Sequence, residues 1–313
     1  MGSEHKIWVD GQLVAWDDAT VHVSAHALHY GSSIFEGIRA YGTPRGLAVL
    51  GLKEHTRRLF QSARIFRMEL PFSEDEVNNA IRETLRANNH PSAYIRPLAI
   101  RGAGPLGVDG RNNPINVFIL TMEWGDYLGA GAVTQGVDVM VSSWRRIAPD
   151  THPGLAKIGG NYVNSQFIVM EAREHGLVEG IALDINGMVS EGSGENLFLV
   201  LDGVIHTPPI ASSILSGVTR RFVMQLIKDH GYEVKQETFP REMLYLADEL
   251  FFTGTAVEVT PIRSVDGYTI GKGARGPITE AIQQDFFAIA RGETEDRHGW
   301  LTPVHAPEQT PAD

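Results

Sequence analysis

The spacing of apolar residues predicts short strands and two helices in the first third of the chain. Two apolar runs flank Asp10-Gly11, a dipeptide that favours a tight hairpin turn. Over residues 54–66, apolar residues recur at three- and four-residue steps, which predicts a helix with Arg58 beside its buried face. Ser73, with a glutamate three residues later, has the spacing of a capping box and predicts the start of a second helix.

Two β-branched stretches of strand length follow, at residues 93–100 and 115–122. With the helices before them, they predict a small α+β domain over residues 1–124. Glycines then cluster in residues 125–136, which we interpret as an interdomain loop. A larger second domain is predicted over residues 137–302.

Turn signals divide the middle of the second domain into strands. Three strand-like pieces between residues 180 and 207 are joined by Asn186-Gly187 and Asp202-Gly203, both typical of type I′ turns. This pattern predicts an antiparallel meander.

A helix is predicted over residues 216–230, because apolar residues recur there at helical spacing and Gly231 follows where a helix commonly ends. Thr219 then lies in its first turn. Residues 303–313 combine prolines with polar residues and lack periodicity, so we expect a disordered tail.

Composition and charge exclude several function classes. The 313 residues are 42% hydrophobic, which is typical of a globular enzyme. A formal charge of −11 argues against binding to nucleic acid or to an anionic membrane surface. The chain has no cysteine, which excludes disulfide and thiolate chemistry but does not indicate a redox compartment. It has no secretory signal pattern and no apolar run long enough for a membrane span, so a cytoplasmic protein acting on small molecules is expected.

Three motifs of the second domain carry the chemistry. They are Lys157-Ile158-Gly159-Gly160-Asn161-Tyr162, Glu191-Gly192-Ser193-Gly194-Glu195-Asn196-Leu197-Phe198 and Leu215-Ser216-Gly217-Val218-Thr219-Arg220. Together they closely resemble the signature of the class IV aminotransferases. The resemblance implies a two-domain α+β fold, with a small N-terminal α/β domain and a larger pseudo-barrel C-terminal domain, and pyridoxal 5′-phosphate as cofactor.

The resemblance also implies roles for individual residues. Lys157 would form the Schiff base and move the substrate proton, and Glu191 would keep the pyridine nitrogen protonated. Tyr162 would bind the phenolic oxygen of the cofactor. The implied phosphate ligands are Arg58, from the pattern His55-Thr56-Arg57-Arg58-Leu59, the turn Gly217-Val218-Thr219 at a helix N-terminus, and Thr255.

Two further stretches, Tyr30 to Tyr41 and Tyr94-Ile95-Arg96-Pro97, resemble the branched-chain subgroup. The implied reaction is a ping-pong transamination between leucine, isoleucine or valine and 2-oxoglutarate. Arg96 would meet the second carboxylate of glutamate, and Tyr94 would help to hold the α-carboxylate. The implied substrate-binding residues are Tyr30, Phe35, Tyr94, Arg96, Leu106, Val108, Trp124, Tyr127, Thr255 and Ala256.

The same resemblance implies a homodimer at minimum, or a hexamer, because a loop matching residues 102–108 closes the neighbouring subunit's pocket in this subgroup. Other members of the family act on D-amino acids or (R)-amines, or as aminodeoxychorismate lyases, and these alternatives share the same lysine. A non-catalytic protein that binds pyridoxal phosphate is an alternative of a different class, but it would not need Tyr94, Arg96 or Thr255.

Two motifs indicate other chemistry and are rejected. Gly102-Ala103-Gly104-Pro105-Leu106-Gly107 has the glycine spacing of a dinucleotide-binding loop, but it contains a proline and no helix pattern follows it. His22, His26 and His29 lie within eight residues of one another, but the segment lacks the further ligands that a closed zinc site needs. No metal site is expected.

Overall fold

The computed structural model describes residues 4–123, 128 and 131–305, and the chain divides into two compact units. The first unit combines residues 1–124 with residues 288–313, and the second comprises residues 125–287. The division after residue 124 falls where the sequence placed a boundary. The prediction was wrong for residues 288–302, which belong to the first unit although the sequence assigned them to the second.

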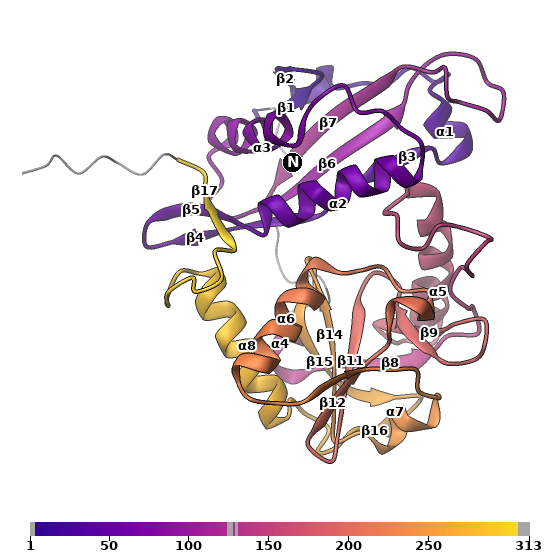
Figure 1. Ribbon diagram of the computed structural model, residues 1–313, viewed down its shortest axis with the longest axis vertical. Helices are drawn as coiled ribbons and strands as arrows, with labels where there is room; N and C mark the ends of the chain where they lie inside the picture. Colours follow the sequence, from indigo (N-terminus) through magenta and orange to yellow (C-terminus); the bar gives the residue numbers. More distant parts are fainter. Residues whose placement is uncertain (1–3, 124–127, 129–130, 306–313) are drawn as a thin grey trace, which may run out of the picture. The chain divides into compact units, whose positions relative to one another are not determined.

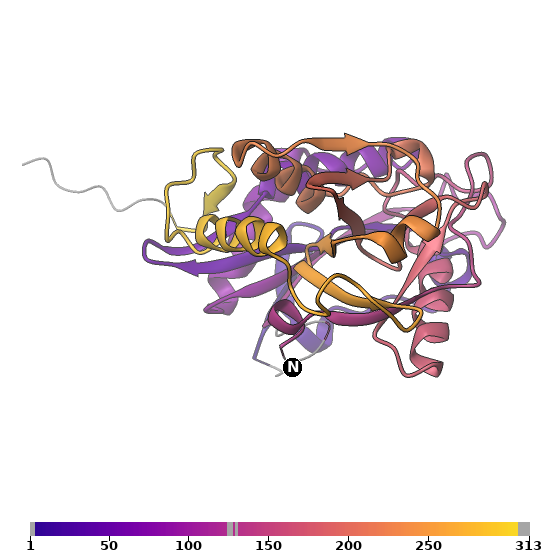
Figure 2. The same ribbon diagram turned by 90° about the horizontal axis from the view of Figure 1, so that it is seen from below.

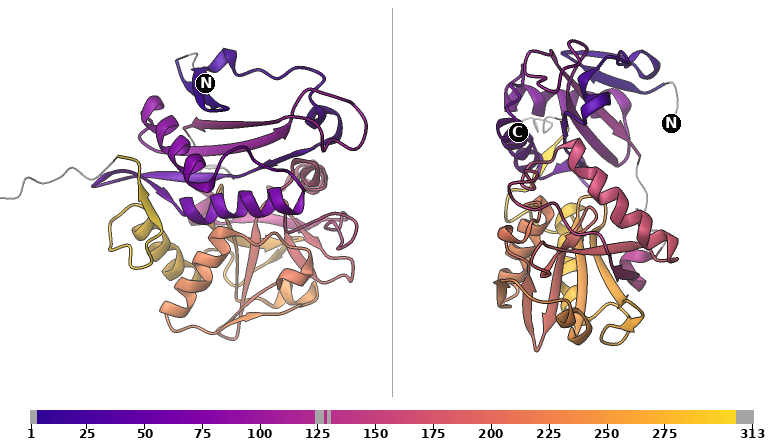
Figure 3. Two further views of the ribbon diagram at one scale, coloured as in Figure 1. Left: turned by 45° about the horizontal axis from the view of Figure 1, so that its top comes forward. Right: turned by 90° about the vertical axis from the view of Figure 1, so that its right-hand side faces the viewer.

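The first unit is built on an 8-stranded sheet with the order β17-β5-β4-β6-β7-β1-β2, and β3 pairs with β6. Its helices α2 and α3 pack against each other, and α3 also packs on β6, β7 and β1 (Figures 1 and 3). The elements are β1 (Lys6–Val9), β2 (Gln12–Ala15), η1 (Trp16–Asp18), α1 (His26–Tyr30), β3 (Ser33–Phe35), β4 (Ile38–Thr43), β5 (Gly46–Leu50), α2 (Leu52–Ile65), α3 (Glu74–Asn88), β6 (Ala93–Arg101), β7 (Ile115–Met122) and β17 (Leu301–Pro303).

Local signals predicted several of these elements correctly. Asp10 and Gly11 both have positive φ, 46° and 100°, and turn β1 into β2 as the hairpin signal indicated. The side chain of Ser73 accepts a hydrogen bond from the backbone of Glu76, and Glu76 returns the contact, so the capping box is present. The helix predicted over residues 54–66 is α2, which begins two residues earlier.

Residues 303–305 contradict the start of the predicted disordered tail, and residues 306–313 lie outside the described residues. Pro303 belongs to β17, which pairs with β5 along the first sheet (Figures 1 and 2). Val304 is fully buried, and its backbone N–H donates to Leu47 O at 2.9 Å. The order of this segment comes from pairing with a strand more than 250 residues away, which no local pattern reveals.

The second unit is built on a 9-stranded sheet with the order β10-β9-β8-β15-β14-β11-β12-β13, and β16 pairs with β15. Helix α5 lies along β9, and α6 packs on β14 and β13 (Figure 3). The elements are α4 (Ala132–Gln135), β8 (Val137–Val141), η2 (Gly159–Asn161), α5 (Tyr162–Glu174), β9 (Glu179–Leu183), β10 (Val189–Gly192), β11 (Asn196–Leu201), β12 (Val204–Thr207), η3 (Ile210–Ser212), α6 (Val218–Asp229), β13 (Val234–Gln236), α7 (Glu242–Leu246), β14 (Glu249–Gly254), β15 (Glu258–Val265), β16 (Tyr268–Thr269) and α8 (Pro277–Ala290), which runs on into the first unit.

The antiparallel meander predicted over residues 180–207 was wrong, because its strands do not all pair with the next strand in sequence. β9 pairs with β10 and β11 pairs with β12, but β11 takes β14 as its other neighbour. β10 stands at one end of the strand order and still contacts β11 near the other end, so the sheet curls on itself. This curl is the feature that the expected pseudo-barrel domain requires.

One of the two predicted type I′ turns was also wrong. Asp202 and Gly203 both have positive φ, 50° and 76°, as that turn demands, whereas only Gly187 does so in the other turn. The carboxylate of Asp184 accepts hydrogen bonds from the backbone of Asn186 at 2.8 Å and Met188 at 3.0 Å. A side chain that caps the loop therefore replaces the expected turn.

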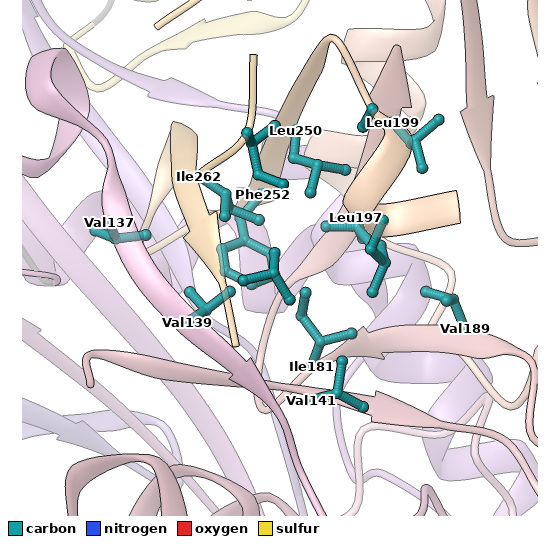
Figure 4. Packing of buried hydrophobic residues seen from close by; sticks show 14 of the residues in the cluster. Val137, Val139, Val141, Ile181, Val189, Leu197, Leu199, Leu250, Phe252 and Ile262 are labelled. Carbon is teal, nitrogen blue, oxygen red and sulfur yellow. The ribbon is translucent and has the colours of Figure 1, made fainter. Parts of the chain in front are cut away.

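The core of the second unit fills the inside of the curled sheet. Side chains from its strands point toward one another, and Figure 4 labels Val137, Val139, Val141, Ile181, Val189, Leu197, Leu199, Leu250, Phe252 and Ile262 among them. The described part of the predicted interdomain loop contains the short helix α4, whose Ala132 belongs to this core. The loop prediction therefore missed one turn of helix.

Candidate active site

Lys157 lies at the end of a loop that leads into η2 and α5. The side-chain amide of Asn161 donates to Pro153 O and Ala156 O, both at 3.1 Å, and this fixes the loop around the lysine. Lys157 is half-buried, and its Nζ donates to the hydroxyl oxygen of Tyr162 at 2.5 Å. Lys157 and Tyr162, which stand in one sequence motif, are thus in direct contact.

Glu191 on β10 is buried and is held by three groups. Arg146 forms an ion pair with its Oε1 at 2.8 Å, and its Oε2 accepts hydrogen bonds from Asn196 Nδ2 at 2.9 Å and from Leu215 N at 3.0 Å. Asn196 Nδ2 also donates to Leu215 O at 2.9 Å. The acid is therefore fixed in position and tied to the loop that precedes α6.

Burial dominates the electrostatics of this carboxylate. Loss of solvent raises the pKa of Glu191 above its usual range, although the charges of Arg146 and Lys157 act in the opposite direction. A carboxylate with a raised pKa binds protons more tightly than one in water. It is suited to share a proton with a basic ring nitrogen placed against it.

Gly217, Val218 and Thr219 form the cap and first turn of α6, where backbone N–H groups lack partners within the helix. A Cβ atom on Gly217 would lie 2.0 Å from Asn196 Oδ1, so only glycine fits beside that asparagine. Thr219 is buried. The structure places the predicted phosphate turn next to the asparagine that also holds Glu191.

Thr255 and Ala256 lie in the turn after β14, and both are half-buried. β14 pairs with β11 so that Thr253 stands opposite Asn196, which brings this turn to the same end of the sheet as the α6 turn. A Cβ atom on Gly254 would come within 3.6 Å of Gly194 O, which shows how closely the two backbones approach.

In the first unit, three predicted substrate-binding residues form one cluster. Tyr94 and Arg96 alternate along β6 and share one face of the sheet, and β3 next to it supplies Phe35. Arg96 Nη2 donates to the Tyr94 hydroxyl at 2.7 Å, and the Arg96 guanidinium lies 4.6 Å from the centre of the Phe35 ring. A Cβ atom on Gly37 would lie 2.2 Å from the Tyr94 hydroxyl, so glycine is required there.

Two other predicted residues of the first unit are also brought together. Tyr30, at the end of α1, donates its hydroxyl to Leu106 O at 2.7 Å. The side chains of Leu106 and Val108 are 45% and 82% exposed. Trp124 and Tyr127 lie outside the described residues.

Arg58 on α2 contacts a group that the sequence did not assign to the site. Its guanidinium donates through Nε and Nη2 to the carboxylate of Glu36, at 2.6 and 2.8 Å. His55, one turn earlier on α2, contacts the same carboxylate through Nδ1 at 2.8 Å. All three side chains are buried.

Several residues that contact the predicted site residues were not predicted from the sequence. Arg146 has no local motif, because its role follows only from the packing of a loop against β10. Glu36, His55 and Asn196 stand inside quoted motifs but were given no task. The spacing of His55 and Arg58, which places both on one helix face, was the available signal for their shared partner.

The structure offers no support for the competing interpretations. Within the described residues, no three His, Asp or Glu side chains are grouped so that they could hold a metal ion. His26 instead contacts Ser32 Oγ at 2.7 Å and Gly107 O at 2.9 Å. Residues 102–114 form an irregular loop without the helix that a dinucleotide-binding motif requires. No helix in the described part of the chain is long and apolar enough to cross a membrane.

Comparisons with known proteins agree on one family. The family model "Amino-transferase class IV" matches residues 33–265. The branched-chain-amino-acid aminotransferase of Salmonella typhimurium is 53% identical over 96% of this chain and 97% of its own length. The crystal structure of the Escherichia coli branched-chain amino acid aminotransferase has a TM-score of 0.94 at 52% identity, covering 96% of this chain and all of that one.

A second solved structure contains a cofactor derivative. The T.th. branched-chain amino acid aminotransferase complexed with N-(5′-phosphopyridoxyl)-L-glutamate has a TM-score of 0.92 at 46% identity, covering 96% of this chain and 99% of that one. The family match spans well over half of the chain, and the relatives cover nearly all of it. The chain therefore belongs to the class IV aminotransferases, in the branched-chain amino acid subgroup.

Proposed function

We propose that this protein transfers the amino group between leucine, isoleucine or valine and 2-oxoglutarate in two ping-pong half-reactions, with pyridoxal 5′-phosphate attached to Lys157. The observation that carries the proposal is the contact between Lys157 Nζ and the Tyr162 hydroxyl, in the same unit as the buried, charge-paired Glu191. The three side chains match the cofactor. Lys157 offers an amine for its aldehyde, Tyr162 a hydroxyl for its phenolic oxygen and Glu191 an acid for its ring nitrogen. The related T.th. enzyme was solved with a phosphopyridoxyl derivative of glutamate, which is consistent with the same cofactor here.

The bound cofactor supplies a ring that accepts the electron pair released when the substrate Cα–H bond breaks. Lys157 Nζ would take that proton from the substrate Cα and deliver it to C4′ of the cofactor, and its hydrogen bond to Tyr162 keeps the amine oriented. Glu191 holds a proton at the ring nitrogen. Arg146 and Asn196 keep the Glu191 carboxylate in one orientation.

The phosphate is proposed to bind at the N-terminus of α6, where Gly217, Val218 and Thr219 present backbone N–H groups. Thr255 and Arg58 are the further proposed ligands. The α6 turn and the Thr255 turn stand at one end of the sheet, which supports a shared ligand.

Arg96 is proposed to let one site accept two kinds of side chain. Phe35 offers an apolar surface for a branched aliphatic group, and the Arg96 guanidinium beside it can bind the second carboxylate of glutamate. Tyr94, together with the backbone of Thr255 and Ala256, is proposed to bind the α-carboxylate that both substrates share. Trp124 and Tyr127 are retained as proposed walls of the apolar pocket.

We further propose that the working unit is at least a homodimer, in which Leu106 and Val108 reach the pocket of a second copy. Their exposure is consistent with this assignment, because both side chains are accessible to a second chain. Analytical ultracentrifugation of the wild type and of Val108→Asp would test it.

Reduction with borohydride tests the central claim. Purified protein loaded with pyridoxal phosphate is expected to absorb visible light, and reduction should fix the cofactor irreversibly on Lys157, as peptide mapping would show. Lys157→Ala is the matched control and should carry no reduced label. A label on another lysine, or the absence of a chromophore after loading, would contradict the proposal.

A further inference from the structure

Glu36 is a carboxylate with no exposed surface, located between β3 and β4 of the first unit. Its Oε1 accepts a hydrogen bond from Arg58 Nε at 2.6 Å. Its Oε2 contacts Arg58 Nη2 and His55 Nδ1, both at 2.8 Å, and Gly37 N at 3.3 Å. Both oxygens are therefore engaged, and the side chain has one fixed orientation.

The backbone of Glu36 is also held in place. Glu36 N donates to Pro97 O on β6 at 2.9 Å, which joins the residue to the centre of the sheet. His55 and Arg58 are three residues apart on α2, so both project from one helix face toward β3, which α2 contacts. Arg58 on α2 therefore pairs with a carboxylate whose backbone is joined to the sheet.

Charge alone does not explain this arrangement. A buried carboxylate is costly unless it is paired, and the Arg58 guanidinium and the His55 contact hold the pKa of Glu36 well below its usual range even though burial opposes them. The same pairing neutralises the positive charge of Arg58, which weakens its attraction for any other anion. If Arg58 served only to attract an anion by its positive charge, it would bind that anion more strongly without Glu36 beside it.

Orientation explains the arrangement. A guanidinium is planar and has five N–H donors in a fixed fork, and the contact with Glu36 engages two of them along the Nε–Nη2 edge. That contact fixes the plane of the group. Holding the fork in one orientation removes the entropy cost of ordering a long side chain when an anion binds.

We propose that Glu36 is a positioning residue for phosphate recognition: with His55 holding its Oε2, it fixes the orientation of the Arg58 guanidinium, the proposed phosphate ligand of the first unit. The inference rests on the proposed role of Arg58 as a phosphate ligand. Glu36 itself does not touch the cofactor. Its removal should weaken binding of the phosphate group and leave recognition of the ring unchanged.

The test compares two probes on the full-length protein freed of cofactor: pyridoxal phosphate, and pyridoxal, which lacks the phosphate. Glu36→Gln should raise the Kd of pyridoxal phosphate about 10-fold. In metal sites, loss of a residue that orients a metal ligand typically lowers metal affinity about 10- to 100-fold, and we expect an effect at the lower end of that range here. The Kd of pyridoxal should change less than about twofold. An equal loss for both probes would make Glu36 a general structural residue and overturn the inference.

A double mutant decides whether Glu36 acts through Arg58. Phosphate discrimination is defined here as the Kd of pyridoxal divided by the Kd of pyridoxal phosphate. In an Arg58→Lys background, which lacks the planar guanidinium, Glu36→Gln should cause no further loss of this discrimination. If Arg58→Lys alone leaves discrimination intact, the proposed phosphate role of Arg58 is wrong. If Arg58→Lys reduces it and Glu36→Gln does not, only the positioning role is wrong.

Asp138→Asn is the matched control. Asp138 accepts hydrogen bonds from Arg263 Nε and Nη2 at 2.9 and 2.6 Å, the same side-on geometry, at a site with no proposed ligand. Both dissociation constants should remain at wild-type values in this variant. His55→Gln provides a milder change if Glu36→Gln does not fold, and it should lower the same discrimination by a smaller factor. An unchanged ratio in His55→Gln would remove histidine from the proposal.

Discussion

Replacement of Arg96 by alanine is expected to damage the two half-reactions unequally, because only glutamate carries a second carboxylate for the guanidinium to bind. Arg96 Nη2 donates to Tyr94, and the guanidinium lies over the Phe35 ring. Within the described residues, its Nε is buried and has no hydrogen-bond partner, so this group has donor capacity that a ligand can use.

The size of the effect follows from what each substrate loses. Loss of a desolvated, charge-assisted contact typically costs about 2–5 kcal/mol, which is about 30-fold to about 4000-fold in the glutamate half-reaction. Leucine loses only the packing and the cation–π support that Arg96 gives to Phe35, about 0.5–1 kcal/mol, or about two- to fivefold. Any disorder of Tyr94 should affect both substrates equally, since both have an α-carboxylate.

Single-turnover changes in the cofactor spectrum with L-glutamate, L-leucine and D-leucine measure these losses directly. Arg96→Lys keeps the charge without the planar fork and should fall between wild type and alanine for glutamate. Arg111→Ala, which removes an exposed arginine paired with Asp109, is the control and should change neither half-reaction. Equal losses for glutamate and leucine in Arg96→Ala would refute the reasoning, and a wild-type preference for D-leucine would overturn the proposed substrate class.

Two buried carboxylates provide further predictions. Glu191→Gln should still form the chromophore but lose at least about 100-fold in kcat, with KM little changed, because an amide cannot hold the ring proton; turnover near the wild-type value would remove Glu191 from its role. Burial and the neighbouring Glu179 and Glu191 carboxylates raise the pKa of Glu195 well above its usual range. The folded state then binds its proton more tightly than the unfolded state, so stability is lost as the pH rises through the folded-state pKa. In urea unfolding of the cofactor-free protein, Glu195→Gln should therefore gain stability over wild type as the pH rises above about 4.3, where an unfolded glutamate loses its proton. A stability difference that does not vary with pH would contradict the assignment.

The sequence by itself determined the elements whose signals are local. The hairpin at Asp10-Gly11, the capping box at Ser73 and the end of α6 at Gly231 each depend on residues within a few positions of one another. The contact between Lys157 and Tyr162 is similarly local, because five residues separate them across a loop and one helical turn. Such features persist in any tertiary arrangement that keeps the segment intact.

The family resemblance predicted more of the site than local sequence patterns did, because a family motif includes residues that are distant in the chain but act at one site. It assigned Glu191 and the α6 turn to one site, and Asn196 donates hydrogen bonds to Glu191 and to Leu215, which precedes that turn. It could not identify the groups that hold those residues in place. Arg146 shares no motif with Glu191, although the two form a buried ion pair.

Only the tertiary structure decided which strands are neighbours. β11 pairs with β14 rather than with β10, and β17 joins the first sheet after the chain has passed through the whole second unit. The fully buried pairing of Glu36 with Arg58 is equally non-local, since it joins a strand end to a helix 22 residues later. Sheet order and buried ion pairs depend on the free energy of burying surfaces far apart in the chain, and hydrophobic periodicity indicates which face is buried but not which partner covers it.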